Sequence, residues 1–141
     1  MPPSTLPPDL LQAYLDTEYR VSGPPAFTLR IGHASAIVRA EHARHQVTCS
    51  AFLTACNPHS QRLAAAANAR RQAVLARVLA RRGLTFTAGI GQHPDNGWPG
   101  EASYLVFGLD LDAAKRLAAQ LQQYAFVWCG ADAVARLIVL P

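Results

Sequence analysis

Hydrophobic and polar positions along the chain predict a mixture of helices and strands. The segment Arg62–Arg82 consists of strong helix formers throughout, and Gly83 follows it where helices commonly end. Phe27, Leu29 and Ile31 alternate with polar residues at the two-residue period of a half-buried strand. Because both periods are present, we expect helices and strands to alternate along the chain.

Weaker patterns of the same two kinds predict the remaining elements. Strands are expected at Val47–Cys56, Leu84–Ile90, Ala102–Phe107, Phe126–Trp128 and Arg136–Leu140, the last two as a hairpin. Helices are expected from an Asp9 N-cap through Glu18, around Ser35–His42, and from Asp110 or Asp112 to about Tyr124. Turn-forming residues predict breaks at Ser22–Pro25 and a loop over Gly91–Gly100.

The order of the central elements is strand, helix, strand, strand, helix, strand, which is that of a split βαβ unit. We therefore predict an α+β fold with a split βαβ (ferredoxin-like) core, extended by an N-terminal helix and strand and by a C-terminal hairpin. The chain has 141 residues, of which 50% are hydrophobic, and this is enough for one core. We expect a single domain over residues 9–141, preceded by a flexible proline-rich lead, Met1–Pro8.

Apolar runs and cysteine spacing exclude several classes of protein. No apolar run approaches the roughly 20 residues that cross a bilayer, and the N-terminus lacks the pattern of a secretory signal. We therefore expect a cytoplasmic protein with no membrane partner. The cysteines show no Cys-x-x-Cys spacing, which argues against a disulfide framework or a thiolate zinc site. His42 and His45 would bind a metal only if four ligands converged, so we expect no metal and no other cofactor.

The charge of the chain permits nucleic-acid contact without requiring it. The formal net charge is +4, from 13 basic and 9 acidic residues. Arg70, Arg77 and Arg81, with Arg62 at the start of the long predicted helix, could form an exposed basic face. A charge stripe is usually a solvated surface, so we expect no nucleic-acid partner and keep binding through this face as an alternative.

One arginine of the long helix is separated from the others by the helical period. Projection at about 100° per residue places Arg71 inside the apolar stripe and Asn68 at its edge, whereas Arg70 and Arg77 lie off it. The stripe itself consists of Leu63, Ala67, Val74, Leu75 and Val78. An arginine that faces the core needs a partner, because an unpaired buried charge costs several kcal/mol.

The partner that we predict for Arg71 is Glu101. Glu101 and Ser103 share a strand face by alternation, and we expect this face to pack on the helices. Asn57, at the tip of the preceding strand, and Ser60, as N-cap of the long helix, complete a polar cluster near the helix N-terminus, which attracts anions. The pattern thus predicts a polar pocket around Arg71.

A purely structural interpretation of these residues stays open. In it, Asn57 and Pro58 form a turn, Ser60 caps the helix, and Arg71 forms a structural ion pair with Glu101. Trp98, in the loop GQHPDNGWPG, is the less ordinary residue, since it either anchors the loop as a lid or meets a ligand.

The chain combines the motifs TACNPHSQ (Thr54–Gln61), Asn68 with Arg71, WPGEAS (Trp98–Ser103) and QYAFVW (Gln123–Trp128) with the N-terminal stretches AYLDTEYRV and FTLRIG. Together these motifs resemble a bacterial family that is known only as a domain of unknown function. The resemblance implies a small cytoplasmic bacterial protein and supplies no activity, substrate or catalytic residue. It adds Gln123 to the candidate site residues.

The function that we expect first is a small-ligand-binding or regulatory module. Its ligand would be anionic or amide-bearing and held by Arg71, Asn57 and Asn68 beneath the Trp98 loop. The alternative is a small enzyme in which Glu101 is a general acid or base and Arg71 stabilises negative charge. The sequence leaves the oligomeric state open, and a homo-oligomer is compatible with it.

Overall fold

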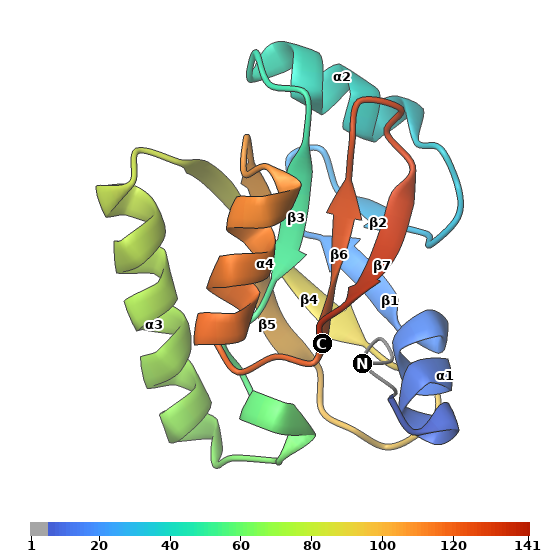
Figure 1. Ribbon diagram of the computed structural model, residues 1–141, viewed down its shortest axis with the longest axis vertical. Coiled ribbons are helices and arrows are strands. Elements are labelled where there is room, and N and C mark those ends of the chain that lie inside the picture. Colours follow the sequence, from blue (N-terminus) through green and yellow to red (C-terminus); the bar gives the residue numbers. More distant parts are fainter. Residues whose placement is uncertain (1–5) are drawn as a thin grey trace.

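Within residues 6–141, which the computed structural model describes, seven strands form one antiparallel sheet and four helices lie against it (Figure 1). The helices are α1 (Pro8–Asp16), α2 (Ala36–Arg44), α3 (Ala65–Arg81) and α4 (Leu111–Gln120). The strands are β1 (Glu18–Val21), β2 (Phe27–Leu29), β3 (Ser50–Leu53), β4 (Thr85–Gln92), β5 (Glu101–Phe107), β6 (Ala125–Cys129) and β7 (Ala135–Val139). Their order in the sheet is β2-β1-β4-β5-β3-β6-β7. The protein is therefore α+β, as the sequence predicts.

The sheet buries side chains on both faces. On one face, α3 and α4 cover an apolar cluster that includes Leu53, Leu79, Val106, Leu117 and Phe126. Both helices lie on this side of the sheet in Figure 1. A core on two faces explains why all residues of β3 are buried and why its apolar side chains point to both faces of the sheet.

The second face is concave, because the sheet curls until its two edges meet. The isolated bridges Ile31–Ala135 and Ala34–Val134 join the segment after β2 to β7. The cluster inside this curl includes Tyr19, Leu29, Val38, Leu105 and Phe107. Odd-numbered positions of β5 therefore point into the curl, whereas Val106 points to α3 and α4.

The first predicted helix extends too far, because its last residue belongs to a strand in the structure. The helix ends at Asp16, and Glu18–Val21 forms β1, which pairs with β2 and β4. Tyr19 and Val21 are buried between exposed neighbours, which is a strand pattern. Two pairing partners and the burial of these side chains outweigh local helix propensity here. Asp9 is not the N-cap either, since Pro7 takes that position and Pro8 begins the helix.

The segment before α3 also differs from the prediction. Ser60 does not cap the helix, which begins at Ala65 after Ala64. Pro58–Ser60 forms a separate 3₁₀ turn, η1, in which His59 and Ser60 have φ values of 51° and 56°. Because this left-handed backbone cannot continue as a right-handed helix, α3 starts several residues later than the composition suggests.

The remaining expectations for helices and strands agree more closely with the structure. Asp110 caps α4 by accepting a hydrogen bond from the backbone N–H of Ala113, although the helix ends at Gln120 rather than near Tyr124. The C-terminal hairpin of β6 and β7 is present. Residues 1–5 of the proline-rich lead predicted over Met1–Pro8 lie outside the described part of the chain, and α1 already begins at Pro8.

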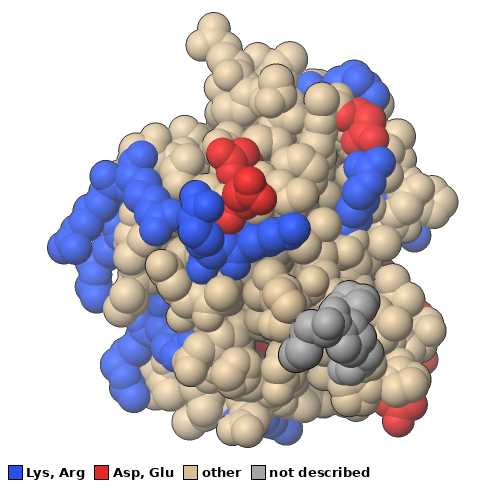
Figure 2. Space-filling model, in the orientation of Figure 1, with Lys and Arg blue, Asp and Glu red and all other residues tan. Residues whose placement is uncertain are grey.

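Basic side chains gather on the side of the molecule that α3 occupies (Figure 2). Arg70 and Arg77 are exposed there, as the helical projection predicts, and Arg81 is exposed as well. Among residues 6–141, no helix is both long enough and apolar enough to cross a membrane.

Candidate functional site

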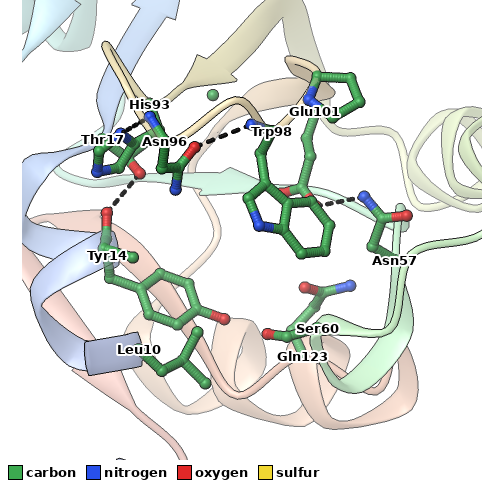
Figure 3. A pocket seen from close by; sticks show the side chains of 13 residues that line it. Leu10, Tyr14, Thr17, Asn57, Ser60, His93, Asn96, Trp98, Glu101 and Gln123 are labelled. Atoms are coloured by element: carbon green, nitrogen blue, oxygen red, sulfur yellow. Dashed lines mark hydrogen bonds between the residues drawn. The ribbon is translucent and has the colours of Figure 1, made fainter. Parts of the chain in front are cut away.

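A pocket of about 190 Å³ lies where α1, η1 and the loop between β4 and β5 meet (Figure 3). We call it the Glu101 pocket. Five of the predicted site residues line it, namely Asn57, Ser60, Trp98, Glu101 and Gln123. Segments far apart in the sequence thus converge on one cavity.

Glu101 places its carboxyl group in the wall of this pocket. It is the first residue of β5 and points to the concave face of the sheet, as Leu105 and Phe107 do. Its Oε2 accepts a hydrogen bond of 2.6 Å from Asn57 Nδ2. Burial raises the pKa of Glu101, and the hydrogen bond from Asn57 opposes this shift only in part. Within residues 6–141, no side chain or backbone group donates to its Oε1, so one oxygen is free for a ligand.

Asn57 orients the carboxyl group of Glu101, and hydrogen bonds with Asn68 of α3 hold Asn57 in place. Asn68 Nδ2 and the backbone N–H of Leu63 donate to Asn57 Oδ1 at 2.8 and 2.9 Å. The backbone N–H of Asn57 donates in return to Asn68 Oδ1 at 2.9 Å. These contacts determine which end of the Asn57 amide faces Glu101. Asn68 therefore supports the site without lining the Glu101 pocket.

The backbone of the turn at Asn57 is strained. Asn57, His59 and Ser60 have φ values of 49°, 51° and 56°, in the left-handed region that side chains other than glycine rarely adopt. Stacking of His59 on Tyr124, with ring centroids 5.1 Å apart, and the hydrogen bonds of Asn57 hold the turn in place. Backbone strain of this kind concentrates at functional sites.

Arg71 does not meet Glu101, and the predicted ion pair is wrong. Its Nε donates to the backbone carbonyl of Ala55 at 2.6 Å, and its Nη2 donates to that of Leu121 at 3.0 Å. Leu121 is the C-cap of α4, where the helix dipole favours a cation. The prediction failed because Glu101 lies on the face of β5 opposite to α3 and α4. Arg71 does not line the Glu101 pocket. It also does not line the neighbouring cavity between the start of α3 and the start of β5.

Ser103 and Gln123 have different places around the pocket. Ser103 is buried and its hydroxyl donates to the backbone carbonyl of Glu101 at 3.0 Å, so it does not line the pocket. Gln123 Nε2 donates to the carbonyl of Cys56 at 3.0 Å. Because this bond uses the amide nitrogen, the carbonyl oxygen of Gln123 is available in the pocket as an acceptor.

Two aromatic side chains form walls of the pocket. In Figure 3 the indole of Trp98 points into the pocket, and Tyr14 reaches in from α1 on the other side. The loop that carries Trp98 is held by Gln92 Nε2, which donates to the Trp98 carbonyl at 3.2 Å, and by Asn96 Oδ1, which accepts from the Trp98 N–H at 3.0 Å. Trp98 is 39% exposed, so the indole can meet a ligand from solvent.

Two residues outside the set selected from the sequence also contribute to this site: Tyr14, and His93, for which an acid–base role and simple turn chemistry fit the sequence equally well. Tyr14 lies on the predicted helix, but nothing in the sequence places that helix beside η1. Burial raises its pKa, so its hydroxyl is a neutral hydrogen-bonding group. His93 Nδ1 accepts from the N–H groups of Asp95 and Asn96, which leaves the ring proton on Nε2. The turn residues around His93 were a usable signal, since loops often carry function.

Among residues 6–141, no three His, Cys, Asp or Glu side chains converge as metal ligands would. His42 is buried and its Nε2 lies 2.8 Å from Ser50 Oγ, and His45 stacks on Phe107 with ring centroids 4.1 Å apart. The two histidines of the i, i+3 pair thus have separate partners in the core.

The fold and the site define an antiparallel α+β protein with a small, partly aromatic pocket beside a half-buried carboxyl group. The sequence model of the family described as "Protein of unknown function (DUF3293)" matches residues 53–126, which is more than half of the chain. The chain therefore belongs to this family. Searches among curated proteins and among solved structures returned no significant match. The matched residues include Asn57, Trp98, Glu101 and Gln123, whereas α1, with Tyr14, lies outside them.

Proposed function

We propose that the protein is a small-ligand-binding module whose ligand donates an N–H group to Glu101. The observation that carries the proposal is the free carboxyl oxygen of Glu101 in a pocket walled by Trp98 and Tyr14. A carboxylate accepts hydrogen bonds strongly, and aromatic walls favour flat or cationic groups. An amide or an amine provides both features.

The lining of the pocket supports the amide-bearing class of ligand rather than the anionic one. No lysine or arginine of the described chain lines the Glu101 pocket, and Arg71 is bonded to backbone carbonyls elsewhere. A volume of about 190 Å³ is below the roughly 300 Å³ at which drug-sized sites begin. The ligand is therefore about the size of a single ring or an amino-acid side chain.

Binding is tested by a thermal-shift screen of small amides, amines and carboxylic acids, followed by isothermal titration calorimetry of the wild-type protein and of each variant. We expect amides or amines to bind, and Glu101→Gln or Trp98→Ala to weaken them by about tenfold to a hundredfold, the value of one charged hydrogen bond. Asp112→Asn, at an exposed position of α4 outside the pocket, is the matched control and should leave affinity unchanged. Binding of carboxylic acids alone, or amide binding that survives both pocket variants, would refute the proposal.

The stability of Glu101→Gln should separate a functional carboxyl group from a structural one. Burial raises the folded-state pKa of Glu101 above its ordinary value of 4.5. The contribution of Glu101 to stability is therefore fully present below pH 4.5, and it is lost as the pH rises through the raised pKa. Glutamine still accepts from Asn57 and has no charge to bury. At neutral pH we expect the variant to lose no stability and to gain up to about 1 kcal/mol, measured by urea denaturation at several pH values. A clear loss would contradict the expected cost of the charge.

A second candidate function is a small enzyme in which Glu101 transfers a proton. The raised pKa of Glu101 favours it, because a general acid or base works best when its pKa lies closer to the operating pH. Each ligand found in the screen would be incubated with the protein and examined for chemical change by mass spectrometry. Turnover that Glu101→Gln abolishes while binding persists would establish this function, and unchanged ligand in every case would exclude it for that set.

We also propose the finer features that the sequence predicts for fold and location. The order β4-β5-β3-β6 with antiparallel neighbours, and the position of α3 and α4 on one face, support a split βαβ (ferredoxin-like) core. Cys49, Cys56 and Cys129 are free and buried, which supports a reducing, cytoplasmic location. The motifs TACNPHSQ and QYAFVW support a bacterial source.

A further inference from the structure

Glu101 is a sheltered carboxyl group without a cationic partner. In residues 6–141 the acidic residues that are not fully exposed are Glu18, Glu41 and Glu101. Arg20 pairs with Glu18, and Arg44 donates to Glu41 from Nε at 2.9 Å and from Nη2 at 2.8 Å. No ion pair of the described chain includes Glu101. The fold thus leaves this carboxyl group without the guanidinium that the other two have.

The missing counter-charge has an energetic cost. A carboxylate that is partly withdrawn from water is stabilised again only when a cation or several hydrogen-bond donors replace the water. Burial raises the pKa of Glu101, and the single hydrogen bond from Asn57 Nδ2 offsets this only in part. A cationic ligand would supply the counter-charge that the described chain does not.

Two oxygen atoms at the wall of the Glu101 pocket are open to such a ligand. Glu101 Oε1 and Gln123 Oε1 accept no hydrogen bond from residues 6–141. Neither is sealed inside the protein, because the buried side-chain polar atom that lacks a partner in this part of the chain is Gln72 Nε2. Both residues line the pocket, and in Figure 3 their side chains reach it beside the Trp98 indole. The pocket therefore offers a pair of accessible acceptors.

The remaining lining of the pocket suits a flat cation. No lysine or arginine of residues 6–141 lines it, so no positive side chain there opposes a cation. His93 also lines it, and its Nδ1 accepts two backbone N–H groups as that of a neutral ring does. Trp98 and Tyr14 form aromatic walls, and aromatic rings attract cations and stack on planar groups.

We propose that the ligand of the Glu101 pocket carries a planar amidinium or guanidinium group. This inference rests on the proposed function and narrows its N–H donor to a cation. One N–H group donates to Glu101 Oε1, and another is available to Gln123 Oε1. The pair of Arg44 and Glu41 shows the same chemistry within this fold. A tetrahedral ammonium group is less suited, because it is more strongly hydrated and cannot stack on the Trp98 indole.

The test compares acetamidinium with acetamide, which have the same planar shape and differ in charge. Each is titrated at neutral pH and constant ionic strength into ¹⁵N-labelled protein. The indole N–H signal of Trp98 and the side-chain amide signals of Gln123 report on the pocket. We expect acetamidinium to bind about tenfold more tightly, the value of one charge-assisted hydrogen bond over a neutral one. Methylammonium, a tetrahedral cation, should bind several-fold more weakly than acetamidinium.

Two charge variants show whether Glu101 causes this preference. Glu101→Gln keeps the shape of the side chain, and acetamidinium should bind to it no more tightly than acetamide. Asp112→Asn removes a negative charge at an exposed position of α4 outside the pocket, so the preference for acetamidinium should remain. The comparison of the two probes in the wild-type protein stays decisive even if Glu101→Gln fails to fold.

The possible results separate this inference from the proposed function. Acetamide that binds to the wild type as tightly as acetamidinium would overturn the cation and leave the proposed function standing. Equal affinity of methylammonium would overturn the planar class. A preference that persists in Glu101→Gln would overturn the contact with Glu101. Pocket signals that neither probe moves up to roughly 100 mM, a generous limit for a fragment, would overturn this inference, whereas the proposed function falls only if every amide and amine of the screen is silent as well.

Discussion

Replacing Arg71 with methionine should lower the free energy of unfolding by about 3 kcal/mol, which is the value of two charge-assisted hydrogen bonds reduced for partial exposure. The variant leaves the carbonyls of Ala55 and Leu121 without the donors that join the end of β3 to the end of α4. Methionine keeps most of the apolar stem, so the loss reports the guanidinium group. Urea denaturation measures it, with an unchanged slope as the sign of two-state unfolding.

Arg70→Met is the matched control for Arg71, since Arg70 is the preceding residue of α3 and is exposed. Its effect should stay within about 0.5 kcal/mol. Arg71→Lys should restore only part of the stability, because an ammonium group lacks the fork that reaches two carbonyls. Equal effects at positions 70 and 71 would show that the two hydrogen bonds contribute nothing. Weaker ligand binding in Arg71→Met with unchanged stability would instead support the ligand contact that the sequence suggests.

Replacing Asn57 with aspartate should destabilise the protein by about 3 kcal/mol at neutral pH, because it removes a donor and sets two partly buried carboxylates against each other. The new carboxylate can still accept from the N–H of Leu63 and from Asn68 Nδ2. Its remaining oxygen would lie beside Glu101 Oε2, where Asn57 Nδ2 now donates over 2.6 Å. The loss therefore reports the contact with Glu101.

The loss in Asn57→Asp should depend on pH with a definite sign. Two neighbouring carboxylates raise each other's pKa in the folded state above the unfolded values. Groups with raised pKa values contribute stability below their unfolded pKa and lose it as the pH rises. The variant should thus approach the wild-type stability below pH 4.5, the ordinary value for Glu101, and fall away above it.

Two further variants isolate the interaction between positions 57 and 101. In Asn57→Asp combined with Glu101→Gln, the donor and the acceptor exchange places, so most of the lost stability should return. Asn96→Asp makes the same change in an exposed loop and should show little pH dependence. A deficit in Asn57→Asp that is constant across pH, or that Glu101→Gln does not relieve, would mean that the two side chains do not interact as described.

The sequence predicted which residues line the candidate site better than it predicted which of them contact one another. Asn57, Ser60, Trp98 and Glu101 do line one pocket, because turn chemistry and strand ends mark where polar side chains meet at an edge of the fold. Gln123 lines it too, but this residue was added through the family resemblance. The helical period likewise predicts that Arg71 is sheltered and Arg77 is not. Neither the helical period nor the strand period identifies the side chain that a given residue contacts on another element. Strand alternation groups Glu101 with Ser103 but does not say whether their shared face meets helices or the concave interior.

Tyr14 and Gln72 illustrate what no local pattern contains. Tyr14 reaches the Glu101 pocket because β1 pairs with β4 and so brings α1 beside the loop of Trp98. In the sequence, Gln72 is an ordinary helix residue. Its amide is buried only because α3 packs beside the end of β3, where Oε1 accepts a hydrogen bond from the N–H of Ala55 and Nε2 has no partner. Both facts depend on strand order, which arises from contacts between residues far apart in the chain.

The sequence by itself determined the α+β class, the long helix and the C-terminal hairpin, because periodicity, capping and turn propensity act over a few neighbouring residues. It also selected five of the residues that line the Glu101 pocket, whereas Asn68, Arg71 and Ser103 of the same set do not line it. Only the tertiary structure decided that Asn57 rather than Arg71 holds Glu101, and that the sheet curls to bury its second face. The physical reason is that the central strands β3 and β5 carry apolar side chains on both faces. Which face receives α3 and α4 is settled by the burial of the whole sheet, and no single segment encodes it.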